Sequence, residues 1–597
     1  MQRRDFLRLA AATAGAVALG PHARLFTAFA QGNTPFVLGV ASGDPLSNAL
    51  IIWTRVTPSV DALPGSGAGP GVNVGWEVAT DPSFNNVVRN GNFPTSTARD
   101  HTVKVDVTGL EPASDYFYRF LWDSFTSPVG RTRTAPALQA DVECLRFGVT
   151  SCSNWEGGYF SPYRHMVERD DLEFVLHLGD YLYEYGPGGY GPGSTYGRSH
   201  EPPREQVALA DYRQRHAQYK GDPDLMALHA RYPFIVTWDD HEVTNDTWKD
   251  GAENHQAAEG DFHQRRDRAY QAYFEWMPIR LPGPDPTRIY RRFHFGRLAD
   301  LSMLDLRQYR DEQVEGIGVG PLTPAISEEL DDPNRTITGA PQMDWLISGL
   351  QSSTSLWNLV GNQVMIAPLK LGNMPALPAA TPLPSGGVPI NPDQWDGYTA
   401  DRSRLLSAIG ERELCNVAFL TGDIHSSWAS DLPLDPGTYP LSPSVATEFI
   451  ATSVNSDNID EATGSPSDAL EEAAKLGNRH LQFVELDSHG YSVADINPDR
   501  LQFDWYYTAD RSDPKSAASF GAAYQTREGS CSVTQAPGPL GEHCAETTAL
   551  GGGDSEQQGN LAATGSAAPL LGGAALAAGA ALAAATRRRD RQVEDDA

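Results

Sequence analysis

Alternating apolar and polar positions dominate the first part of the chain. Val74–Val78 and Thr102–Val107 each place an apolar side chain at every second position, which is the period of a strand with one buried face. Turn residues (Gly, Pro, Asn and Asp) separate such stretches as far as Ala137. The pattern predicts an all-β domain over residues 35–137.

A different pattern runs over residues 144–510. Short apolar runs with the length of fully buried strands recur through it: Phe174–Leu178, Phe234–Trp238 and Val417–Leu420. Longer charged or amphipathic stretches of helical period lie between them: Asp211–His229 and Asp261–Trp276. Strands that alternate with helices predict a layered α/β domain.

Two further segments differ from these domains. Gly109–Arg119 resembles the turn and following strand of a fibronectin-type β-sandwich, in which a tyrosine at this place hydrogen-bonds back across the corner. We therefore expect the first domain to be structural. After about Ser512 the composition shifts to Gly, Ala, Ser and acidic residues, which favours a flexible stalk over residues 511–560.

Three of the apolar runs are followed by the same kind of polar string. Asp180 follows the first run, Asp240 and His241 the second, and Asp423 and His425 the third. The carboxyl ends of parallel strands meet at one edge of a sheet, so we expect these side chains to lie close together. Carboxylate and imidazole groups bind metals. The recurrence predicts a metal site at that edge.

The neighbours of these residues refine the expected chemistry. Asp180 is the expected bridge between two cations, because Gly179 before it allows close approach of the backbone. Cys152 follows another apolar strand and is interpreted as a thiolate ligand, and Tyr183 can reach the same cation as Asp180. Thiolate and tyrosinate favour trivalent iron over magnesium. Two cations that share a carboxylate activate water for attack on phosphorus.

The amino terminus has the pattern of an export signal. Arg3 and Arg4 precede an apolar run, Leu9–Leu19, and the small residues Ala28–Ala30. This order predicts a twin-arginine signal peptide over residues 1–30, with the twin-arginine translocase as a partner.

Residues 561–597 have the pattern of a second targeting signal. Leu561–Gly565 precedes an apolar segment and a basic tail, as in sortase-type sorting signals, which would make sortase and the cell wall peptidoglycan partners. The alternative is a retained membrane anchor, since the apolar segment is long enough to span a bilayer. Both interpretations place the protein at the cell surface.

The net charge limits the possible binding partners, and the positions of the cysteines indicate which of them can form a disulfide. The formal net charge is −30 over 597 residues, which repels nucleic acid and excludes a nucleic-acid binding role. Of the five cysteines, Cys531 and Cys544 are expected to pair under oxidising conditions. Cys144 and Cys415 lie beside apolar strands and are expected to be buried small residues.

The motifs together resemble the PhoD-like alkaline phosphatases and phosphodiesterases, within the calcineurin-like metallophosphoesterase superfamily. The resemblance extends from Phe36 to about Asp510. It depends on six strings in order: Gly39–Pro45, Ser151–Ser153, Gly179–Tyr183, Trp238–Glu242, Gly361–Gln363 and Gly422–His425. It implies an α/β protein with an N-terminal fibronectin-type β-sandwich, a metallophosphoesterase αββα sandwich and a flexible C-terminal tail.

The resemblance also implies two metal positions. The first is an Fe(III) site with four ligands: Cys152, Asp180, Tyr183 and His425. The second has four oxygen ligands: Asp180, Asp240, Asn362 and Asp423. The wider superfamily has Asn in place of Asp240, and His in place of Asn362 and Asp423. The change towards oxygen favours calcium, so we expect one or two Ca²⁺ beside the Fe(III).

Several residues around the ligands have expected roles of their own. His241 is placed like the superfamily histidine that contacts phosphate or protonates the leaving oxygen, and Asp239 and Glu242 are expected to orient it. Arg307 is either a clamp for a substrate phosphate or part of an ordinary salt bridge. His177 lies inside an apolar strand and is expected in the core.

The expected function is that of an exported, cell-surface phosphoesterase that hydrolyses phosphate mono- and diesters by attack of a metal-activated hydroxide on phosphorus. One alternative is a phospholipase D-like phosphodiesterase, which an apolar lining of the two expected mouth loops, Gly186–Gly197 and Gly372–Pro392, would favour. A distant alternative is a wall-attached binding protein with a non-catalytic metal site.

Overall fold

The computed structural model describes residues 34–541, with gaps at residues 281–282, 284–286, 316–323, 372–387 and 412–413. The expected signal peptide, the sorting signal and Cys544 lie outside the described residues. Within the described part, no helix is both long enough and apolar enough to cross a membrane.

One sheet of ten strands runs through the molecule. Its strands, from edge to edge, are β24 (Val533–Gln535), β23 (Ala518–Arg527), β22 (Arg500–Thr508), β21 (Gly490–Ile496), β9 (Leu145–Thr150), β10 (Val175–His177), β11 (Pro233–Val236), β1 (Val40–Gly43), β2 (Ala49–Arg55) and β5 (Thr102–Thr108). The central strands β9, β10 and β11 are parallel. Their carboxyl ends therefore meet at one edge, as the sequence predicted.

A second large sheet has seven strands. They are β12 (Arg291–Phe295), β13 (Ala299–Met303), β14 (Trp357–Asn362), β17 (Val417–Thr421), β19 (Ser444–Ile450), β18 (Ser427–Pro433) and β20 (Leu481–Glu485), in that order. Strands β13, β14, β17 and β19 are parallel. A separate pair consists of β15 (Lys370–Leu371) and β16 (Val388–Pro389).

The two large sheets pack face to face through an apolar core. Within it, Phe174 stacks with Phe147 of β9 at 4.5 Å between ring centroids and with Phe295 of β12 at 5.1 Å. Burial of aromatic and aliphatic side chains on both inner faces holds the layers together. Helices then cover both outer faces, which gives a mixed α/β fold in four layers.

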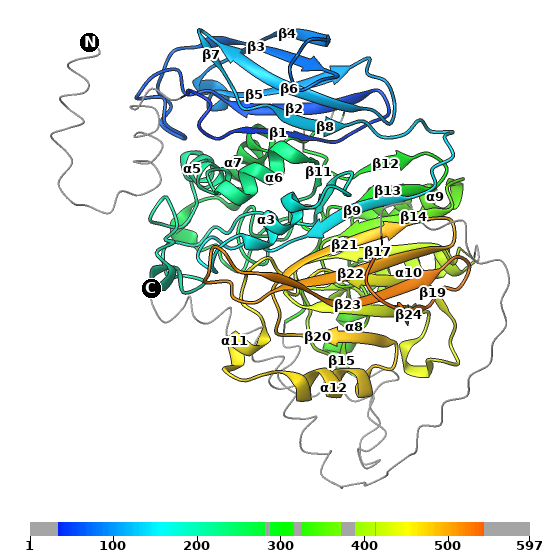
Figure 1. Ribbon diagram of the computed structural model, residues 1–597. Coiled ribbons are helices and arrows are strands. Elements are labelled where there is room, and N and C mark those ends of the chain that lie inside the picture. Colours follow the sequence, from blue (N-terminus) through cyan, green and yellow to red (C-terminus); the bar gives the residue numbers. More distant parts are fainter. Residues whose placement is uncertain are drawn as a thin grey trace.

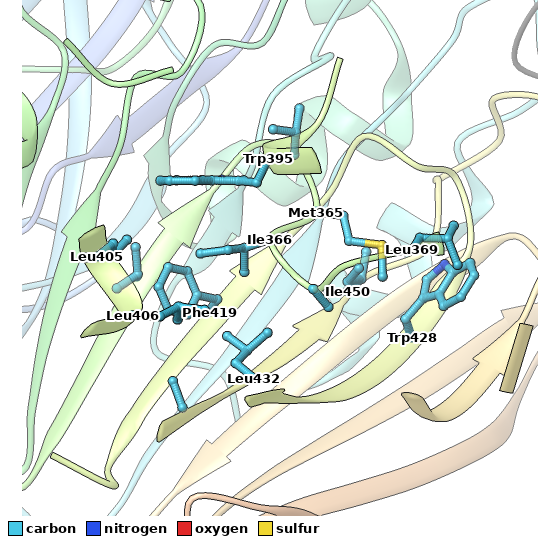
Figure 2. Packing of buried hydrophobic residues seen from close by; sticks show 14 of the residues in the cluster. Met365, Ile366, Leu369, Trp395, Leu405, Leu406, Phe419, Trp428, Leu432 and Ile450 are labelled. Atoms are coloured by element: carbon cyan, nitrogen blue, oxygen red, sulfur yellow. The ribbon is translucent and has the colours of Figure 1, made fainter. Parts of the chain in front are cut away.

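Different helices cover the two faces. The described helices are α3 (Ser161–Glu168), α4 (Gly193–Tyr196), α5 (Leu209–Lys220), α6 (Pro223–Arg231), α7 (Phe262–Trp276), α8 (Pro324–Leu330), α9 (Ala340–Ser352), α10 (Thr399–Gly410), α11 (Ile459–Thr463) and α12 (Asp468–Gly477). The outer face of the ten-stranded sheet packs against α3, α5, α6 and α7. Helices α9 and α10 pack on the other sheet, where Leu405 and Leu406 lie against Phe419 (Figure 2).

The expected helix over Asp211–His229 is divided in two. Helix α5 ends at Lys220, and α6 begins at Pro223. Asp222 accepts hydrogen bonds from the backbone N–H groups of Asp224 and Leu225, which caps the second helix. Proline is tolerated in a first helical turn but ends a helix that arrives from before it. The local sequence therefore held the signal for the break.

The N-terminal strands lie in two sheets that pack on each other, and one of the two continues into the rest of the molecule. Strands β3 (Val72–Ala79), β4 (Val87–Thr95), β6 (Asp115–Trp122), β7 (Phe125–Thr126) and β8 (Gly130–Arg133) form a sheet of their own. It packs on β1, β2 and β5, and these belong to the ten-stranded sheet through the parallel pairing of β1 with β11. Of the strands drawn in blue in Figure 1, β1, β2 and β5 thus belong to the ten-stranded sheet, whereas β3, β4, β6 and β7 belong to the separate one. The expected tyrosine contact is present: Tyr116 Oη accepts from the N–H of Glu111 at 2.8 Å.

The C-terminal boundary was placed too early. Residues 511–541 are not a stalk, because β23 and β24 lie within them and extend the large sheet. A disulfide joins Cys531 to Cys415 at the start of β17, so the expected pairing of Cys531 with Cys544 is wrong. Cys144 is also disulfide-bonded, and neither it nor Cys415 is a free buried thiol. Cys152 is the single free cysteine in the described part of the chain.

Candidate metal centre

The predicted ligands lie at the carboxyl ends of strands from both sheets. Cys152, Asp180 and Asp240 follow β9, β10 and β11 of the ten-stranded sheet, and Asp423 follows β17 of the other sheet. The acidic, thiol and imidazole groups form three clusters in which the possible ligand atoms lie within 4.8 Å of one another. The clusters are Cys152, Asp180 and His425; Asp180, Asp240 and His241; and Asp180, Asp239, Asp240 and Asp423. Asp180 belongs to all three.

An unusual backbone conformation turns these side chains toward one another. Cys152, Asp180, Asp423 and His425 have φ values of 59°, 52°, 63° and 58°. This left-handed region is unfavourable for residues with a Cβ and persists where the surrounding structure imposes it. Its occurrence at four predicted ligands, directly after strands, points to a functional constraint.

One side of the centre, which we call the thiol side, consists of Cys152, Tyr183 and His425 around Asp180. Its side chains are closely packed. Tyr183 Oη lies 3.1 Å from Asp180 Oδ2 and 3.1 Å from His425 Nε2. His425 Nδ1 is 2.8 Å from the carbonyl oxygen of Asp457. A carbonyl can only accept, so Nδ1 carries the proton and Nε2 is left with a lone pair directed at the centre.

The acidic side contains buried carboxylate oxygens that the protein leaves unsatisfied. Asp180 Oδ1, Asp239 Oδ2 and Asp240 Oδ1 are buried without a hydrogen-bond partner among the described residues. Burial raises the pKa of Asp180 and of Asp239 well above the ordinary value. Burial, and after it the carboxylate of Asp180, also raises the pKa of Cys152. Bound cations would remove these penalties and deprotonate the thiol, so the donor set fits a metal centre.

Arg307 forms salt bridges with the acidic cluster. Its side chain is 1% exposed and pairs with Asp239, with Asp393 at 2.7 Å and with Asp423 at 3.4 Å. The salt-bridge interpretation of Arg307 therefore describes the structure. Asp239 is engaged by Arg307 and does not orient His241.

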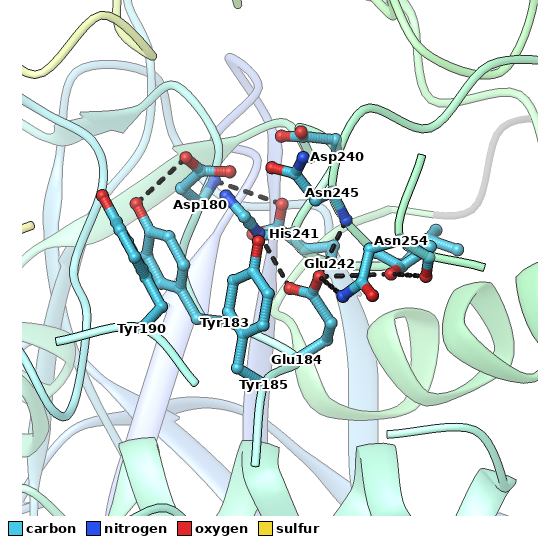
Figure 3. Close-up of polar contacts among 12 residues, drawn as sticks. Asp180, Tyr183, Glu184, Tyr185, Tyr190, Asp240, His241, Glu242, Asn245 and Asn254 are labelled. Atoms are coloured by element: carbon cyan, nitrogen blue, oxygen red, sulfur yellow. Dashed lines mark hydrogen bonds and ion pairs between the residues drawn. The ribbon is translucent and has the colours of Figure 1, made fainter. Parts of the chain in front are cut away.

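Glu184, which the sequence analysis missed, holds His241. Glu184 Oε2 lies 2.8 Å from His241 Nδ1 (Figure 3). Its other oxygen accepts from the backbone N–H of Asn245 at 2.8 Å and from Asn254 Nδ2 at 3.0 Å. Although burial opposes ionisation, the contacts with His241 lower the pKa of Glu184 to about 2. A fixed carboxylate behind the imidazole sets its tautomer and direction.

Glu242 has a backbone role instead of the expected one. Its carboxylate accepts from the N–H groups of Asp239 at 2.7 Å, Asp180 at 3.1 Å and Tyr181 at 2.6 Å. It thus ties the loop after β10 to the loop after β11. The two loops carry Asp180 and Asp240, so Glu242 fixes the separation of these two carboxylates.

Asn362, Tyr190 and His177 are also buried, and each has a defined neighbour. Asn362 ends β14 and is fully buried; its Oδ1 accepts from Trp395 Nε1 at 3.1 Å and keeps a second lone pair. Tyr190, from the expected mouth loop Gly186–Gly197, packs beside Tyr183 at 5.5 Å between ring centroids (Figure 3). His177 is fully buried and contacts Tyr163, which confirms its expected place in the core.

A substitution tests the role of Glu184. Glu184→Gln keeps the shape but removes the negative charge paired with His241, so we expect kcat for the phosphate-ester hydrolysis that the sequence predicts to fall about 10- to 100-fold. Steady-state kinetics measures the effect. Glu168→Gln is the matched control, because it removes an exposed carboxylate 3.1 Å from His165 Nδ1. Equal kcat values for both variants would refute the role.

Two facing sheets whose strand ends gather carboxylates, imidazoles and a thiol define a layered α/β protein with a candidate metal centre. A family model described as PhoD-like phosphatase matches residues 147–505, and a model of the N-terminal domain of the same phosphatases matches residues 22–136. The chain belongs to the PhoD-like phosphatase family. It is accordingly an enzyme, a hydrolase acting on phosphoric ester bonds.

Two relatives support this assignment. The chain is 40% identical over 495 residues to alkaline phosphatase D of Bacillus subtilis (strain 168), which covers 82% of this chain and 80% of that protein. It is similar to a solved structure described as "Structure of PhoD", with a TM-score of 0.75 and 37% identity, over 85% of this chain and 94% of that one.

Proposed function

We propose that the chain is an exported, cell-surface phosphoesterase that hydrolyses phosphate mono- and diesters at the centre built around Asp180. The observation that carries the proposal is that Asp180 belongs to all three clusters of possible ligands, with the imidazole of His241 in one of them. A carboxylate in that position can bridge two cations. A histidine beside it can donate a hydrogen bond to a phosphate oxygen or a proton to a leaving group.

The proposal assigns two unlike metal positions. Fe(III) would be held by a thiol, a carboxylate, a phenol and an imidazole: Cys152, Asp180, Tyr183 and His425. Ca²⁺, one ion or two, would be held by oxygen atoms alone: Asp180, Asp240, Asn362 and Asp423. Donor chemistry supports the division, because soft and strongly donating anions favour iron and hard oxygens favour calcium. When bound, the cations supply charge stabilisation at phosphorus and acidify a water molecule.

The proposed catalytic residues besides Asp180 act on the substrate. Burial lowers the pKa of His241, but neighbouring carboxylates, Asp240 first among them, outweigh burial and raise it well above the ordinary value. An imidazole paired with the carboxylate of Glu184 can donate a proton to the leaving oxygen. Arg307 NH2 lies 3.5 Å from Asp240 Oδ1 and 3.4 Å from Asp423 Oδ1. This position beside the calcium ligands supports contact with a substrate phosphate as well.

Export and surface attachment are part of the proposal. A twin-arginine signal peptide over residues 1–30 and a sortase-type signal over residues 561–597 would lie on either side of an N-terminal domain and a catalytic domain. The proposed partners are the twin-arginine translocase, sortase and peptidoglycan. Mass spectrometry of the mature protein tests this: a chain that starts near Gln31 and ends at Thr564 supports it, and an uncut chain contradicts it.

The catalytic proposal is tested with two chromogenic substrates. We expect the purified protein to release p-nitrophenol from both p-nitrophenyl phosphate and bis-p-nitrophenyl phosphate in the presence of calcium. A calcium chelator should reduce both rates at least tenfold, and added Ca²⁺ should restore them. Magnesium at the same concentration is the control. No release from either substrate with calcium and iron present would overturn the proposal.

The alternatives predict other results in the same assay. A phospholipase D-like diesterase would prefer phosphatidylcholine vesicles to small esters by a higher kcat/KM. Most of the second expected mouth loop, Gly372–Pro392, lies outside the described residues, so the substrate panel has to decide. A wall-attached binding protein would retain metal but release no product.

A further inference from the structure

A loop that follows β19 contacts the thiol side of the centre without being one of its predicted ligands. The loop consists of Ser453–Asn458, which we call the 453–458 loop. It lies far in sequence from Cys152 and Tyr183 and was not singled out by any motif. Its contacts nevertheless reach three of the four residues assigned to Fe(III).

Ser456 is the first point of contact. Its hydroxyl oxygen lies 2.8 Å from Tyr183 Oη and 2.9 Å from the carbonyl oxygen of Cys152. The side chain is fully buried, so water does not compete for it. A hydroxyl has one proton and can donate to one of these oxygens at a time. When Tyr183 is a phenolate, its oxygen is the stronger acceptor and receives that proton.

Asp457 and Asn455 provide two more contacts. The carbonyl oxygen of Asp457 accepts from His425 Nδ1 at 2.8 Å, which fixes the imidazole. Asn455 Oδ1 accepts from the backbone N–H of Asn154 at 2.8 Å, and Asn154 stands two residues after Cys152. The 453–458 loop thus sets the positions of a phenol, an imidazole and the chain that carries the thiol.

Arg511 holds this loop from the outside. Its guanidinium donates to the carbonyl oxygen of Asn455 at 2.9 Å and to Asp457 Oδ1 at 2.7 Å, and it lies 3.3 Å from Glu461. Its own carbonyl oxygen accepts from the N–H of Tyr159 at 2.8 Å. The side chain is 9% exposed. One residue between β22 and β23 therefore joins the 453–458 loop to the loop after β9.

We propose that Ser456 and Arg511 are positioning residues for the Fe(III) site: Ser456 through the donor strength of Tyr183, and Arg511 through the placement of the whole 453–458 loop. The inference depends on the iron position assigned under the proposed function. Outer-shell partners of metal ligands commonly change metal affinity by about 10- to 100-fold when they are removed. Neither residue is among the proposed ligands or the proposed catalytic residues.

The test compares variants of the full chain by iron content and by the visible absorption band of a phenolate bound to Fe(III). Ser456→Ala should move the band to longer wavelength, because a phenolate without its hydrogen bond is more easily oxidised. Arg511→Ala should weaken iron binding about 10- to 100-fold and broaden the band. The position of the band reports the electronic state of the phenolate–iron pair, which a loss of general stability would not alter.

Two control variants match the two substitutions. Ser492→Ala removes an equally buried hydroxyl on β21. Arg146→Ala removes a buried arginine that pairs with Asp495 at 2.8 Å near the start of β9, at the far end from Cys152. We expect both controls to keep the iron content and the band of the unchanged protein, with Arg146→Ala lowering the melting temperature.

The possible results distinguish a failure of the positioning roles of Ser456 and Arg511 from a failure of the proposed iron site. Iron and a visible band in the unchanged protein, with shifts in the two variants alone, support the inference. If Ser456→Ala and Arg511→Ala have the same iron content and band as the controls, the positioning roles are overturned. The iron site itself is then still supported. An unchanged protein that binds no iron overturns the iron site itself. If Arg511→Ala fails to fold, the band of Ser456→Ala decides.

Discussion

Replacing Asp180 with asparagine is expected to lower kcat/KM on phosphate esters at least a thousandfold, which corresponds to about 4 kcal/mol of transition-state stabilisation. Asparagine has nearly the same shape and tolerates the left-handed backbone found at this position, where φ is 52°. The variant therefore removes a negative charge and little else. Metal analysis of the same preparation should show both metals below a tenth of their content in the unchanged protein.

The size of this effect follows from the position of Asp180. It is 1% exposed and belongs to each cluster of possible ligands, so no other carboxylate can take its place between two cations. Its Oδ1 has no hydrogen-bond partner in the described structure, and its burial raises its pKa. In the absence of metal the charge destabilises the fold, so we expect metal-free Asp180→Asn to melt no lower than the metal-free unchanged protein.

A buried aspartate outside the centre is the control. Asp431 on β18 is also 1% exposed and accepts from the N–H of Val533 at 2.6 Å and from Tyr439 Oη at 2.6 Å. Asp431→Asn should lower stability by about 1–3 kcal/mol through a damaged hydrogen-bond set, with metals and activity retained. Full activity in Asp180→Asn would contradict the bridging role.

Replacing Cys152 with alanine is expected to remove iron and leave calcium. Cys152 is the free cysteine of the described chain, 1% exposed, and its burial raises the pKa of its thiol. A thiolate forms there only when a cation compensates the charge. Loss of the sulfur takes away the softest of the four assigned ligands, so iron per protein should fall below a tenth, as measured by elemental mass spectrometry.

The matched control for Cys152→Ala is the double variant Cys415→Ala/Cys531→Ala. It removes the two sulfur atoms of the disulfide between β17 and the turn before β24, away from the clusters of possible ligands. It should keep its iron, with a lower melting temperature because the closed loop is lost. Unchanged iron in Cys152→Ala would refute the assignment of the thiol.

The sequence predicted most of the side chains that meet at the centre, but it did not indicate the residue that holds His241. The strand-end strings predicted that Asp180, Asp240, His241, Asp423 and His425 lie close together, because parallel strands bring their carboxyl ends to one edge of a sheet. The prediction of a single sheet edge was wrong, because the third string follows β17 of the second sheet. Glu184 was missed, although it lies in the string after Asp180. Its role depends on which loop faces His241, and that is set by the packing of β10 beside β11.

Contacts between segments that are distant in the chain could not be predicted from the sequence, because they also depend on how the sheets are assembled. Cys531 stands near Cys544 in the chain but near Cys415 in the fold, because β22, β23 and β24 continue the sheet and return the chain to the start of β17. The composition after residue 511, rich in small residues, predicts a stalk, yet β23 and β24 lie there and extend the ten-stranded sheet. The break at Gly221–Pro223, in contrast, could have been predicted from its capping residues.

The sequence by itself determined the family, the layered α/β class and the identity of the side chains that converge on Asp180. These depend on local pattern: the period of the strands and the polar residues at their ends. Only the tertiary structure decided which groups orient those side chains, namely Glu184 for His241 and the 453–458 loop, held by Arg511, for the thiol side. Such contacts join residues from 32 to 304 positions apart, and no local period records them. The reason is geometric: a sheet brings strand ends together by rule, whereas the partners that surround them are fixed by how the layers pack.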